Sequence, residues 1–255
     1  MGVKISVVMP VYNAGLLISK ALKSIADQER LLDEVVIVND GSVDNTLEEI
    51  DKWRSRLPIK LINNDQRLGV TPSLRKGVDS ATSELVLRLD HDDYWLPDHS
   101  RWMSKLAEDS SQAAIFCSRA TVVNEEGKEL ATTPNMTDAA VRPLLMWDNP
   151  LTASATGFWK EKYTQVGGYH ADELWEDYDL WLRLLCEGPL FFTGKATVVY
   201  RTSNSSISRV KRSTAIKERW RCQRRAIRLF WRRYPLEALR CFVLGGVRFA
   251  LSNIR

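Results

Sequence analysis

Short apolar runs alternate with amphipathic segments along the first ninety residues. Apolar runs of four to six residues with little polar alternation are typical of parallel strands that are covered on both faces. In the first amphipathic segment, apolar residues recur at intervals of three and four, which places them on one helix face. The pattern predicts strands at 5–9, 34–38, 59–62 and 84–89, and helices at 18–25, 47–57 and 72–81. This alternation predicts an α/β fold with a doubly wound, mostly parallel sheet.

The second half of the chain is less regular. Its pattern predicts helices near 97–108 and 177–186, a short helix ending at Gly167-Gly168, strands near 114–117, 153–159 and 197–200, and a hairpin turn at 125–128. Residues 203–208 are polar and read as a linker. We therefore expect one domain over residues 1–208, with one half up to residue 93 and a second half over 94–208, followed by a C-terminal segment over 209–255.

Composition narrows the class of protein. The 255 residues are 44% apolar and 27% charged, which is ordinary for a globular chain. The four cysteines form no CxxC pair and have no histidine at ligand spacing, so we expect free thiols, a cytoplasmic location and no structural zinc. The first residues lack a signal-peptide pattern. The longest uncharged stretch, 5–19, has 15 residues, whereas a membrane-spanning helix needs about 20.

The net charge of +4 hides an asymmetry. Residues 209–255 hold 14 Lys and Arg against two Asp and Glu, a net charge of +12, whereas the rest of the chain carries −8. Within this segment, intervals of 4, 7, 4 and 3 residues place one set of side chains on a single helix face, as an apolar and aromatic stripe: Ile216, Trp220, Ile227, Trp231 and Tyr234. A basic helix with such a stripe is typical of an anionic membrane surface, which predicts a peripheral position at the inner face of the cytoplasmic membrane. The alternative is a helix whose stripe packs on the body. Nucleic acid is not an expected partner, because no nucleic-acid motif is present.

Three carboxylates lie within four residues in Asp90-His91-Asp92-Asp93, directly after the fourth predicted strand. Ligands of open α/β sheets bind beyond the carboxyl ends of the strands. Carboxylate oxygens there suit a hard cation such as Mg²⁺ or Mn²⁺, which can also bridge a diphosphate. The alternative interpretation is a solvated acidic turn.

Other strand ends carry further candidates. Asp40 follows the second strand and can accept a hydrogen bond from a nucleobase or ribose, although Asp and Gly also form plain turns. Tyr12 follows the first strand and can stack on a base or belong to the core. Arg75 can pair with a phosphate through its planar guanidinium or lie on a helix surface.

A second acidic motif, Glu176-Asp177-Tyr178-Asp179, opens a predicted helix. The helix dipole stabilises acidic residues at this position, which by itself explains one or two of them. The neighbouring Trp175 and Trp181, with Tyr178, predict an aromatic wall suited to sugar rings. A carboxylate beside such a wall could act as a general base.

An ordered set of motifs links these candidates. It comprises Val7-Val-Met-Pro-Val-Tyr-Asn13, Val36-Ile-Val-Asn-Asp-Gly-Ser42, Leu74-Arg-Lys-Gly77, Leu89-Asp-His-Asp-Asp93, Gly167-Gly-Tyr169 and Glu176-Asp-Tyr-Asp-Leu-Trp-Leu-Arg183. Over about residues 3–202, the set resembles family 2 glycosyltransferases with the GT-A fold. Each motif alone is weakly specific, and the ordered set is highly specific.

The resemblance assigns roles to individual residues. Residues 1–93 would form the nucleotide-binding half and 94–208 the acceptor half. Asp177 would be the catalytic base, with Glu176, Trp175 and Trp181 on the acceptor side. The nucleotide sugar would contact Val11, Tyr12, Asn13, Asp40, Arg75, Asp90, His91 and Asp92, and Asp90 and Asp92 would hold a divalent metal, Mn²⁺ or Mg²⁺. The chain departs from the family at Asn39, where an acidic residue is common, and at Lys76, where asparagine is common.

The resemblance also implies the reaction. A hydroxyl of a glycan or lipid-linked glycan would attack the sugar of a UDP-sugar in a single displacement with inversion. Two other functions fit the same features. One is a non-catalytic, membrane-associated protein that binds nucleotide sugars. The other is a nucleotidyltransferase, which also combines an α/β sheet with a metal-binding acidic cluster.

Overall fold

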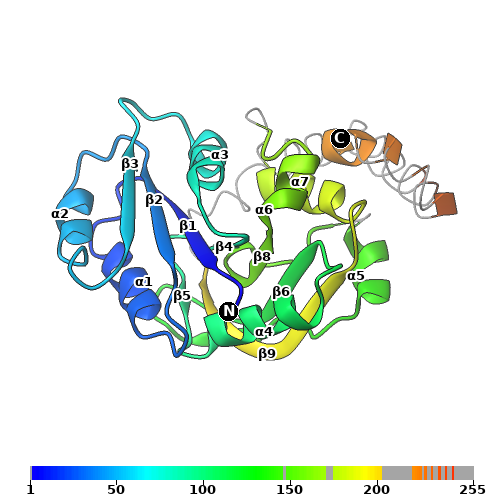
Figure 1. Cartoon of the computed structure of the whole chain (residues 1–255), viewed down its shortest axis with the longest axis horizontal. Helices are drawn as coiled ribbons and strands as arrows, with labels where there is room; N and C mark the ends of the chain where they lie inside the picture. Colours follow the sequence, from blue (N-terminus) through cyan, green and yellow to red (C-terminus); the bar gives the residue numbers. More distant parts are fainter. Residues whose placement is uncertain are drawn as a thin grey trace.

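The computed structural model describes residues 2–145, 148–170 and 175–202, and parts of the C-terminal segment: 220–225, 227–228, 231, 235–236, 239 and 243. Within these residues, one sheet of nine strands runs through the molecule, with helices on both of its faces (Figure 1). The strand order is β3-β2-β1-β4-β8-β6-β9-β5, and β7 pairs with β6. The predicted α/β class and the doubly wound sheet are therefore confirmed.

The first half follows the predicted alternation closely. Its elements are β1 (Ile5–Val11), α1 (Leu17–Ala26), β2 (Glu34–Asn39), α2 (Thr46–Asp51), β3 (Ile59–Asn63), α3 (Val70–Ser80) and β4 (Leu85–Arg88). Strands β3, β2, β1 and β4 are all parallel. Helix α2 ends six residues earlier than predicted, because Trp53 and Arg56 donate to carbonyls three residues back and the chain tightens into turns. Leu57 is still buried, so the apolar spacing marks a buried face although the helix ends before Leu57.

The second half contains more structure than its pattern predicted. Its elements are β5 (Tyr94–Trp95), α4 (His99–Asp109), β6 (Ile115–Val123), β7 (Glu129–Thr132), α5 (Asp138–Leu145), a 3₁₀ turn η1 (Ala153–Ala155), β8 (Thr156–Trp159), α6 (Lys160–Gln165), α7 (Glu176–Leu184) and β9 (Leu190–Arg201). Strand β9 has 12 residues where four were expected. Its register with β6 shifts twice, and such irregular strands lack a clean alternation of apolar and polar positions.

Two apolar cores lie on the two faces of the sheet. On β1, Val7 and Met9 pack with α1, α2 and α4, whereas Val8 packs with α3, α5, α6 and α7. Helix α3 lies directly on the sheet, since a Cβ added at Gly77 would be 2.5 Å from Cγ1 of Val8. Because both faces are covered, the strand ends are held by rigid packing, and these ends carry the candidate site.

Part of the C-terminal segment packs on the body. Cys222 is fully buried and Gln223 is 3% exposed, and the amide of Gln223 donates to the hydroxyl of Tyr178 in α7 at 3.0 Å. Nη1 of Arg225 donates to Asp179 of α7 at 3.0 Å. For these residues the structure therefore shows the packed alternative, and they are not a segment separate from the body.

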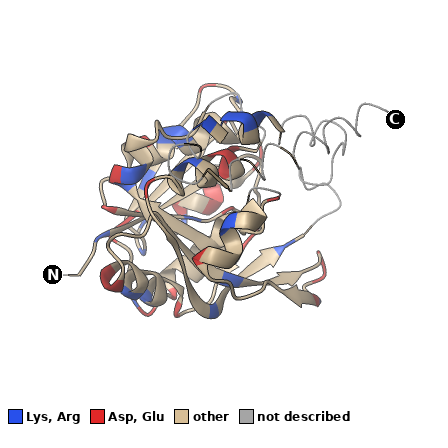
Figure 2. Ribbon diagram, turned by 90° about the vertical axis from the view of Figure 1, so that its right-hand side faces the viewer, with Lys and Arg blue, Asp and Glu red and all other residues tan. Residues whose placement is uncertain are grey.

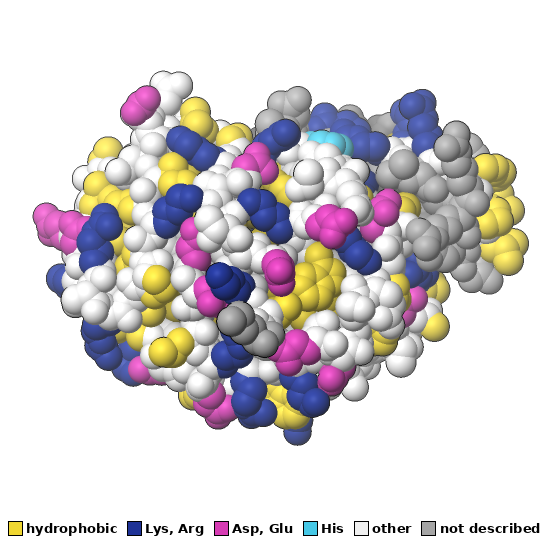
Figure 3. Space-filling view, in the orientation of Figure 1, with side chains coloured by type: hydrophobic (Ala, Val, Ile, Leu, Met, Phe, Trp, Pro, Cys, Tyr) yellow, Lys and Arg dark blue, Asp and Glu magenta, His cyan; other side chains and the backbone are white. Residues whose placement is uncertain are grey.

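Other described residues of this segment face solvent. Trp231, Leu236, Leu239 and Val243 are all about half exposed or more. In the space-filling view, hydrophobic side chains gather at the right-hand edge, over this segment (Figure 3). The predicted linker at 203–208, and Ile216 and Tyr234 of the predicted stripe, lie outside the described residues. Among the described helices, none is both long enough and apolar enough to cross a membrane.

Charges on the body are mixed in sign. Positions of Lys and Arg lie among positions of Asp and Glu over the described ribbon (Figure 2).

Candidate active site

The first two predicted strand ends meet through direct hydrogen bonds. The backbone N–H of Asp40 donates to the carbonyl of Val11, and the side-chain oxygen of Asn13 accepts from the N–H of Val43. Asn13 has a φ of 47°, a left-handed conformation that asparagine tolerates better than most residues. The structure thus brings together Val11, Asn13 and Asp40, as the strand order predicts.

Asp40 is buried, and the groups that donate to its carboxylate all lie in the loop that follows β3. One carboxylate oxygen accepts from the amide of Asn64 and from the N–H of Leu68, both at 2.8 Å, and the other accepts from the N–H of Gly69 at 2.7 Å. Lys76 continues this chain by donating to the side-chain oxygen of Asn64 at 2.9 Å. Lys76, which stands where the family commonly has asparagine, therefore belongs to the network that fixes Asp40. The contact of Asp40 with a nucleobase stays a prediction.

Tyr12 and Arg75 occupy different surroundings. The guanidinium of Arg67 lies 4.0 Å from the ring centre of Tyr12, so one face of this ring is already covered by a cation. Arg75 is half exposed and donates to the carbonyl of Tyr169 at 3.1 Å. The structure thus places Arg75 beside the Gly167–Tyr169 motif, with a guanidinium accessible to a phosphate.

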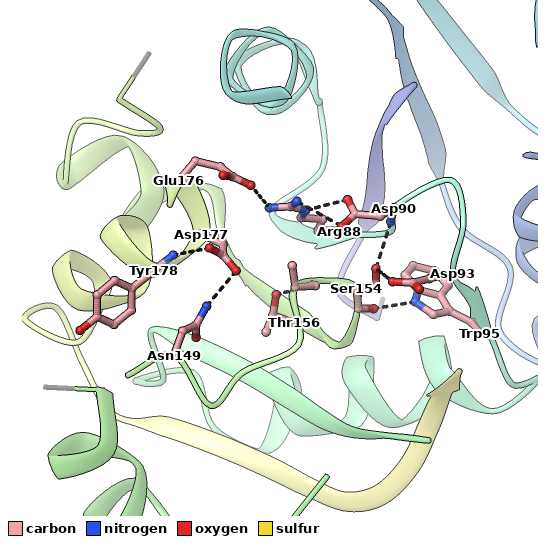
Figure 4. Close-up of polar contacts among 11 residues, drawn as sticks. Arg88, Asp90, Asp93, Trp95, Asn149, Ser154, Thr156, Glu176, Asp177 and Tyr178 are labelled. Carbon is pink, nitrogen blue, oxygen red and sulfur yellow. Dashed lines mark hydrogen bonds and ion pairs between the residues drawn. The ribbon is translucent and has the colours of Figure 1, made fainter. Parts of the chain in front are cut away.

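The acidic turn after β4 is fixed to η1 by one serine. The hydroxyl of Ser154 accepts from the N–H of Asp90 at 3.1 Å and donates to Asp93 at 2.5 Å, as Figure 4 shows. Asp93 is 2% exposed and its other oxygen accepts from the N–H of Arg201 in β9 at 2.8 Å. Asp93 therefore holds the turn against the second half, while Asp90, His91 and Asp92 remain partly exposed.

The pKa values of two carboxyls in this turn are raised. Burial, followed by the charge of Asp90, raises the pKa of Asp92. Burial, followed by the charges of Asp92 and Asp90, raises the pKa of Asp93 well above its usual range. A cation at Asp90 and Asp92 would relieve this repulsion, which is an electrostatic reason for metal binding here.

Two carboxylates of α7 lie at the same end of the sheet. Asp177 accepts from the amide of Asn149 at 2.9 Å and from the N–H of Tyr178 at 2.7 Å, and burial raises its pKa. Glu176 is 7% exposed, and burial raises its pKa to about 7 against the attraction of Arg88. A carboxyl whose pKa lies above its usual range is a better proton acceptor when ionised, as a general base requires.

Arg88 joins the two acidic motifs. Its side chain is 5% exposed on β4, and Nε and Nη2 donate to the two oxygens of Asp90 at 3.0 and 3.2 Å. Its Nη1 donates to Glu176 at 3.0 Å, so the guanidinium lies between the two carboxylates (Figure 4). One buried cation thus holds residues 86 positions apart, counted from Asp90 to Glu176, at a single site.

The predicted aromatic wall is wrong for Trp181. Its side chain is fully buried and packs beside Phe158 at a ring distance of 6.0 Å. Tyr178 is also fully buried and donates to the carbonyl of Leu145 at 2.6 Å. Tyr178, Trp181, Leu182 and Leu185 follow a helical spacing of three and four, which makes them the core face of α7. Trp175 is partly buried and keeps its place as an acceptor-side prediction.

The possible ligands in this site fit a metal whose coordination shell is completed by oxygen atoms of the substrate. The described residues hold no group of three or more His, Cys, Asp and Glu that could bind a metal by themselves. Asp90 and Asp92 supply two hard carboxylates, and Mg²⁺ commonly uses one or two carboxylates together with substrate phosphates and water. Asp90 is meanwhile neutralised by Arg88.

Sequence reasoning missed Arg88, Asn149 and Ser154. Arg88 had a detectable signal, because a lone arginine in the apolar run of residues 85–89 must find a buried anion. Asn149 lies between predicted elements and Ser154 lies at the start of a predicted strand, and their partners are 28 and 61 residues away in the sequence. No local pattern could have revealed them.

Comparison with known proteins agrees with this geometry. The model of the family described as Glycosyl transferase family 2 matches residues 6–163. The amylovoran biosynthesis glycosyltransferase AmsE of Erwinia amylovora is 29% identical over 174 residues, covering 67% of this chain and 65% of AmsE, so the match spans slightly less than two thirds of that relative. The UDP-Gal:alpha-D-GlcNAc-diphosphoundecaprenol beta-1,3-galactosyltransferase of Escherichia coli is 29% identical over 191 residues, covering 72% of this chain and 69% of that enzyme.

Solved structures share the fold at low sequence identity. S. aureus TarS 1-349 in complex with UDP-GlcNAc has a TM-score of 0.76 and 18% identity, covering 98% of this chain and 72% of that one. The mannosyltransferase PcManGT from Pyrobaculum calidifontis, in complex with GDP-Man and Mn²⁺, has a TM-score of 0.72 and 18% identity, covering 100% and 74%. The family match extends over more than half of the chain, and its motifs meet at one end of the sheet. The chain is therefore a member of glycosyltransferase family 2.

Proposed function

We propose that this chain transfers a sugar from a UDP-sugar to a hydroxyl of a lipid-linked glycan, with inversion at the anomeric carbon. The E. coli relative is named for a UDP-Gal donor and a diphosphoundecaprenol-linked acceptor, and AmsE is named for amylovoran biosynthesis. The TarS structure contains UDP-GlcNAc. These names support a UDP-sugar donor and an acceptor in polysaccharide synthesis.

One observation carries the proposal. Asp90, which the donor side requires, and Glu176, which adjoins the candidate base Asp177, contact the same guanidinium of Arg88. A donor diphosphate near Asp90 would therefore lie close to the first turn of α7. A single displacement needs an acceptor hydroxyl, a base and the anomeric carbon at one place, and this arrangement supplies it.

The chain's own residues then account for each step. Asp177 takes the proton of the acceptor hydroxyl, and the hydroxyl oxygen bonds to the anomeric carbon from the face opposite the diphosphate. The bond between that carbon and the diphosphate oxygen breaks, and the nucleoside diphosphate leaves with the bonding electrons. The amide of Asn149 holds the second oxygen of Asp177, which fixes the direction of the carboxylate. A positioned base contributes about 10²–10⁴-fold to a rate.

Asp90 and Asp92 are the residues that would hold Mg²⁺ or Mn²⁺. When bound there, the cation would offset the negative charge that develops on the leaving diphosphate.

A panel of nucleotide sugars tests the proposal. The chain is incubated with each nucleotide sugar in the presence of Mn²⁺ and membrane lipid extract. The released nucleotide and the anomeric configuration of the product are then measured. Release of UDP with an inverted product supports the proposal. A binding protein without catalysis would show thermal stabilisation by UDP-sugars and no turnover. A nucleotidyltransferase would instead release pyrophosphate from UTP and a sugar phosphate.

The C-terminal segment supports a peripheral position on the membrane. Its charge of +12 accompanies four exposed apolar side chains, at positions 231, 236, 239 and 243. Vesicles with phosphatidylglycerol should bind the chain, and vesicles of phosphatidylcholine alone should not. A chain truncated after residue 228 keeps the part that packs on α7 but lacks the four exposed apolar side chains, and it should bind these vesicles more weakly. Equal sedimentation of the full and truncated chains would contradict the membrane assignment.

A further inference from the structure

Arg88 is the most constrained charge in the site. It lies on β4, the strand that ends at the acidic turn, and its side chain is 5% exposed. Three of its donor atoms are engaged, two by Asp90 and one by Glu176, at 3.0 to 3.2 Å. The planar guanidinium can serve two carboxylates at once because its donors form a rigid fork.

We propose that Arg88 is a positioning residue, anchored by Glu176, that fixes the donor-side carboxylate Asp90 relative to the base-bearing first turn of α7. This inference rests on the proposed function, because it assigns Arg88 and Glu176 to the geometry of that reaction. Neither residue needs to touch the reacting atoms. Glu176 acts through Arg88, and Arg88 acts through Asp90.

The connections around α7 explain why such a tie is needed. At its first turn, Asp177 is held by Asn149, whose segment lies between α5 and η1 and belongs to the second half. The contact of Arg88 with Glu176 instead joins this turn to β4, in the first half of the sheet. A displacement of reacting groups by about 1 Å can cost about 100-fold in rate, so this connection has a measurable effect on kcat.

A purely structural ion pair would behave differently. Removing one member of a buried pair is strongly destabilising, whereas replacing both members by apolar residues is often neutral for stability. The double variant Arg88→Met/Glu176→Leu therefore distinguishes a role in positioning Asp90 for catalysis from a role in stability alone. It leaves neither member of the Arg88–Glu176 pair buried without its partner, and it removes the connection between Asp90 and α7.

The experiment compares this double variant with Glu176→Gln, Arg88→Lys and the wild-type chain. Melting temperature, calorimetric binding of UDP with Mn²⁺, and kcat and KM for hydrolysis of the best UDP-sugar of the panel are measured. We expect the double variant to melt near the wild-type temperature while its kcat falls about 100-fold. Glu176→Gln keeps an acceptor for Arg88 but not the charge, so its kcat should fall about tenfold, with UDP affinity within about twofold of wild type.

Arg88→Lys tests the fork geometry. A lysine ammonium is a point charge and cannot hold Asp90 in two bonds while it contacts Glu176, so it should not rescue kcat. Arg142→Lys is the matched control. Arg142 is also buried, pairs with Asp138 at 2.9 Å and donates to the carbonyl of Leu185, but it contacts neither acidic motif in these bonds. Its substitution should lower the melting temperature and leave kcat and KM unchanged.

Three results would overturn the inference. They are a stable double variant with wild-type kcat, a Glu176→Gln variant with wild-type kcat, or full rescue by Arg88→Lys, which would mean that positive charge alone suffices. Should the double variant fail to fold, Glu176→Gln still decides the question. The wild-type arm tests the proposed function separately, since a chain that neither binds UDP nor hydrolyses any UDP-sugar contradicts that function whatever the variants do.

Discussion

The acidic turn after β4 and the acidic first turn of α7 contain the same kinds of residue and divide them in the same way between buried and partly exposed positions. In each, one aspartate is almost completely buried: Asp93 is 2% exposed and Asp179 is 1% exposed. In each, other carboxylates remain partly accessible, namely Asp90 and Asp92 in the first turn and Asp177 in the second. Both motifs therefore combine one buried carboxylate with carboxylates that can meet a substrate.

The two buried aspartates are stabilised in different ways. Asp93 contacts the hydroxyl of Ser154 and the N–H of Arg201, and burial with its acidic neighbours raises its pKa well above the usual range. Asp179 lies against the guanidinium of Arg183 at 2.6 and 2.9 Å, and also meets Arg225. Asp93 thus adds negative charge beside Asp90 and Asp92, where a cation is expected, whereas Asp179 is neutralised by arginines of the protein itself.

The largest effect is expected from Asp177→Asn. Asparagine keeps the size of the side chain and an oxygen for Asn149, but it cannot take a proton. Transfer should fall about 10²–10⁴-fold, while UDP binding with Mn²⁺ persists because Asp90 and Asp92 are untouched. Rates and calorimetry on the same preparation check this. If Asp177 were only a helix cap, asparagine would replace it without loss, and full transfer activity would remove Asp177 from the mechanism.

Asp179→Asn, in the same helix as Asp177, should affect stability in place of the transfer rate. The change leaves Arg183, which is 3% exposed, without its anionic partner. Breaking a buried pair costs about 3–5 kcal/mol, so the free energy of unfolding in urea should fall by that amount. At a temperature where the variant is folded, kcat should stay within a few-fold of wild type. A stable variant with a large loss of kcat would contradict the assignment of Asp179 to stability and of Asp177 to catalysis.

The contrast between the motifs also shows what the sequence could predict. Covered parallel strands and helix starts are local patterns, and they placed Asp90 and Asp177 at the correct ends of their elements. Trp181 was assigned to the wrong surface because its nearness to the acidic motif outweighed its position on the apolar stripe with Tyr178 and Leu182. The support from Asn149 and Ser154 depends on chain segments that meet only in the folded sheet, so no local pattern contains it.

Asp92→Asn tests the donor side. The variant removes one of two candidate metal ligands and the charge repulsion with Asp90 that helps to raise the pKa of Asp92. Loss of a residue that merely supports a ligand costs about 10–100-fold in metal affinity, so loss of the ligand should weaken Mn²⁺-dependent UDP binding by at least that factor. Titration of UDP with Mn²⁺ and with EDTA measures this. Asp98→Asn, at an aspartate outside both acidic motifs, is the control and should bind as wild type.

The last prediction concerns pH and Glu176. Burial raises the pKa of Glu176 from its ordinary value of 4.5 to about 7. Between these values the folded chain retains a proton that the unfolded chain has released, so the unfolding free energy falls as pH rises through this window. Glu176→Gln removes this contribution, and its stability relative to wild type should therefore increase from about pH 4.5 to about pH 7 and level off outside it. Urea unfolding at half-unit pH steps measures the difference. Glu187→Gln, at an exposed position, should follow the wild-type curve. Parallel curves for wild type and Glu176→Gln would show that Arg88 keeps Glu176 ionised throughout, and the two acidic motifs would then share one permanently charged network.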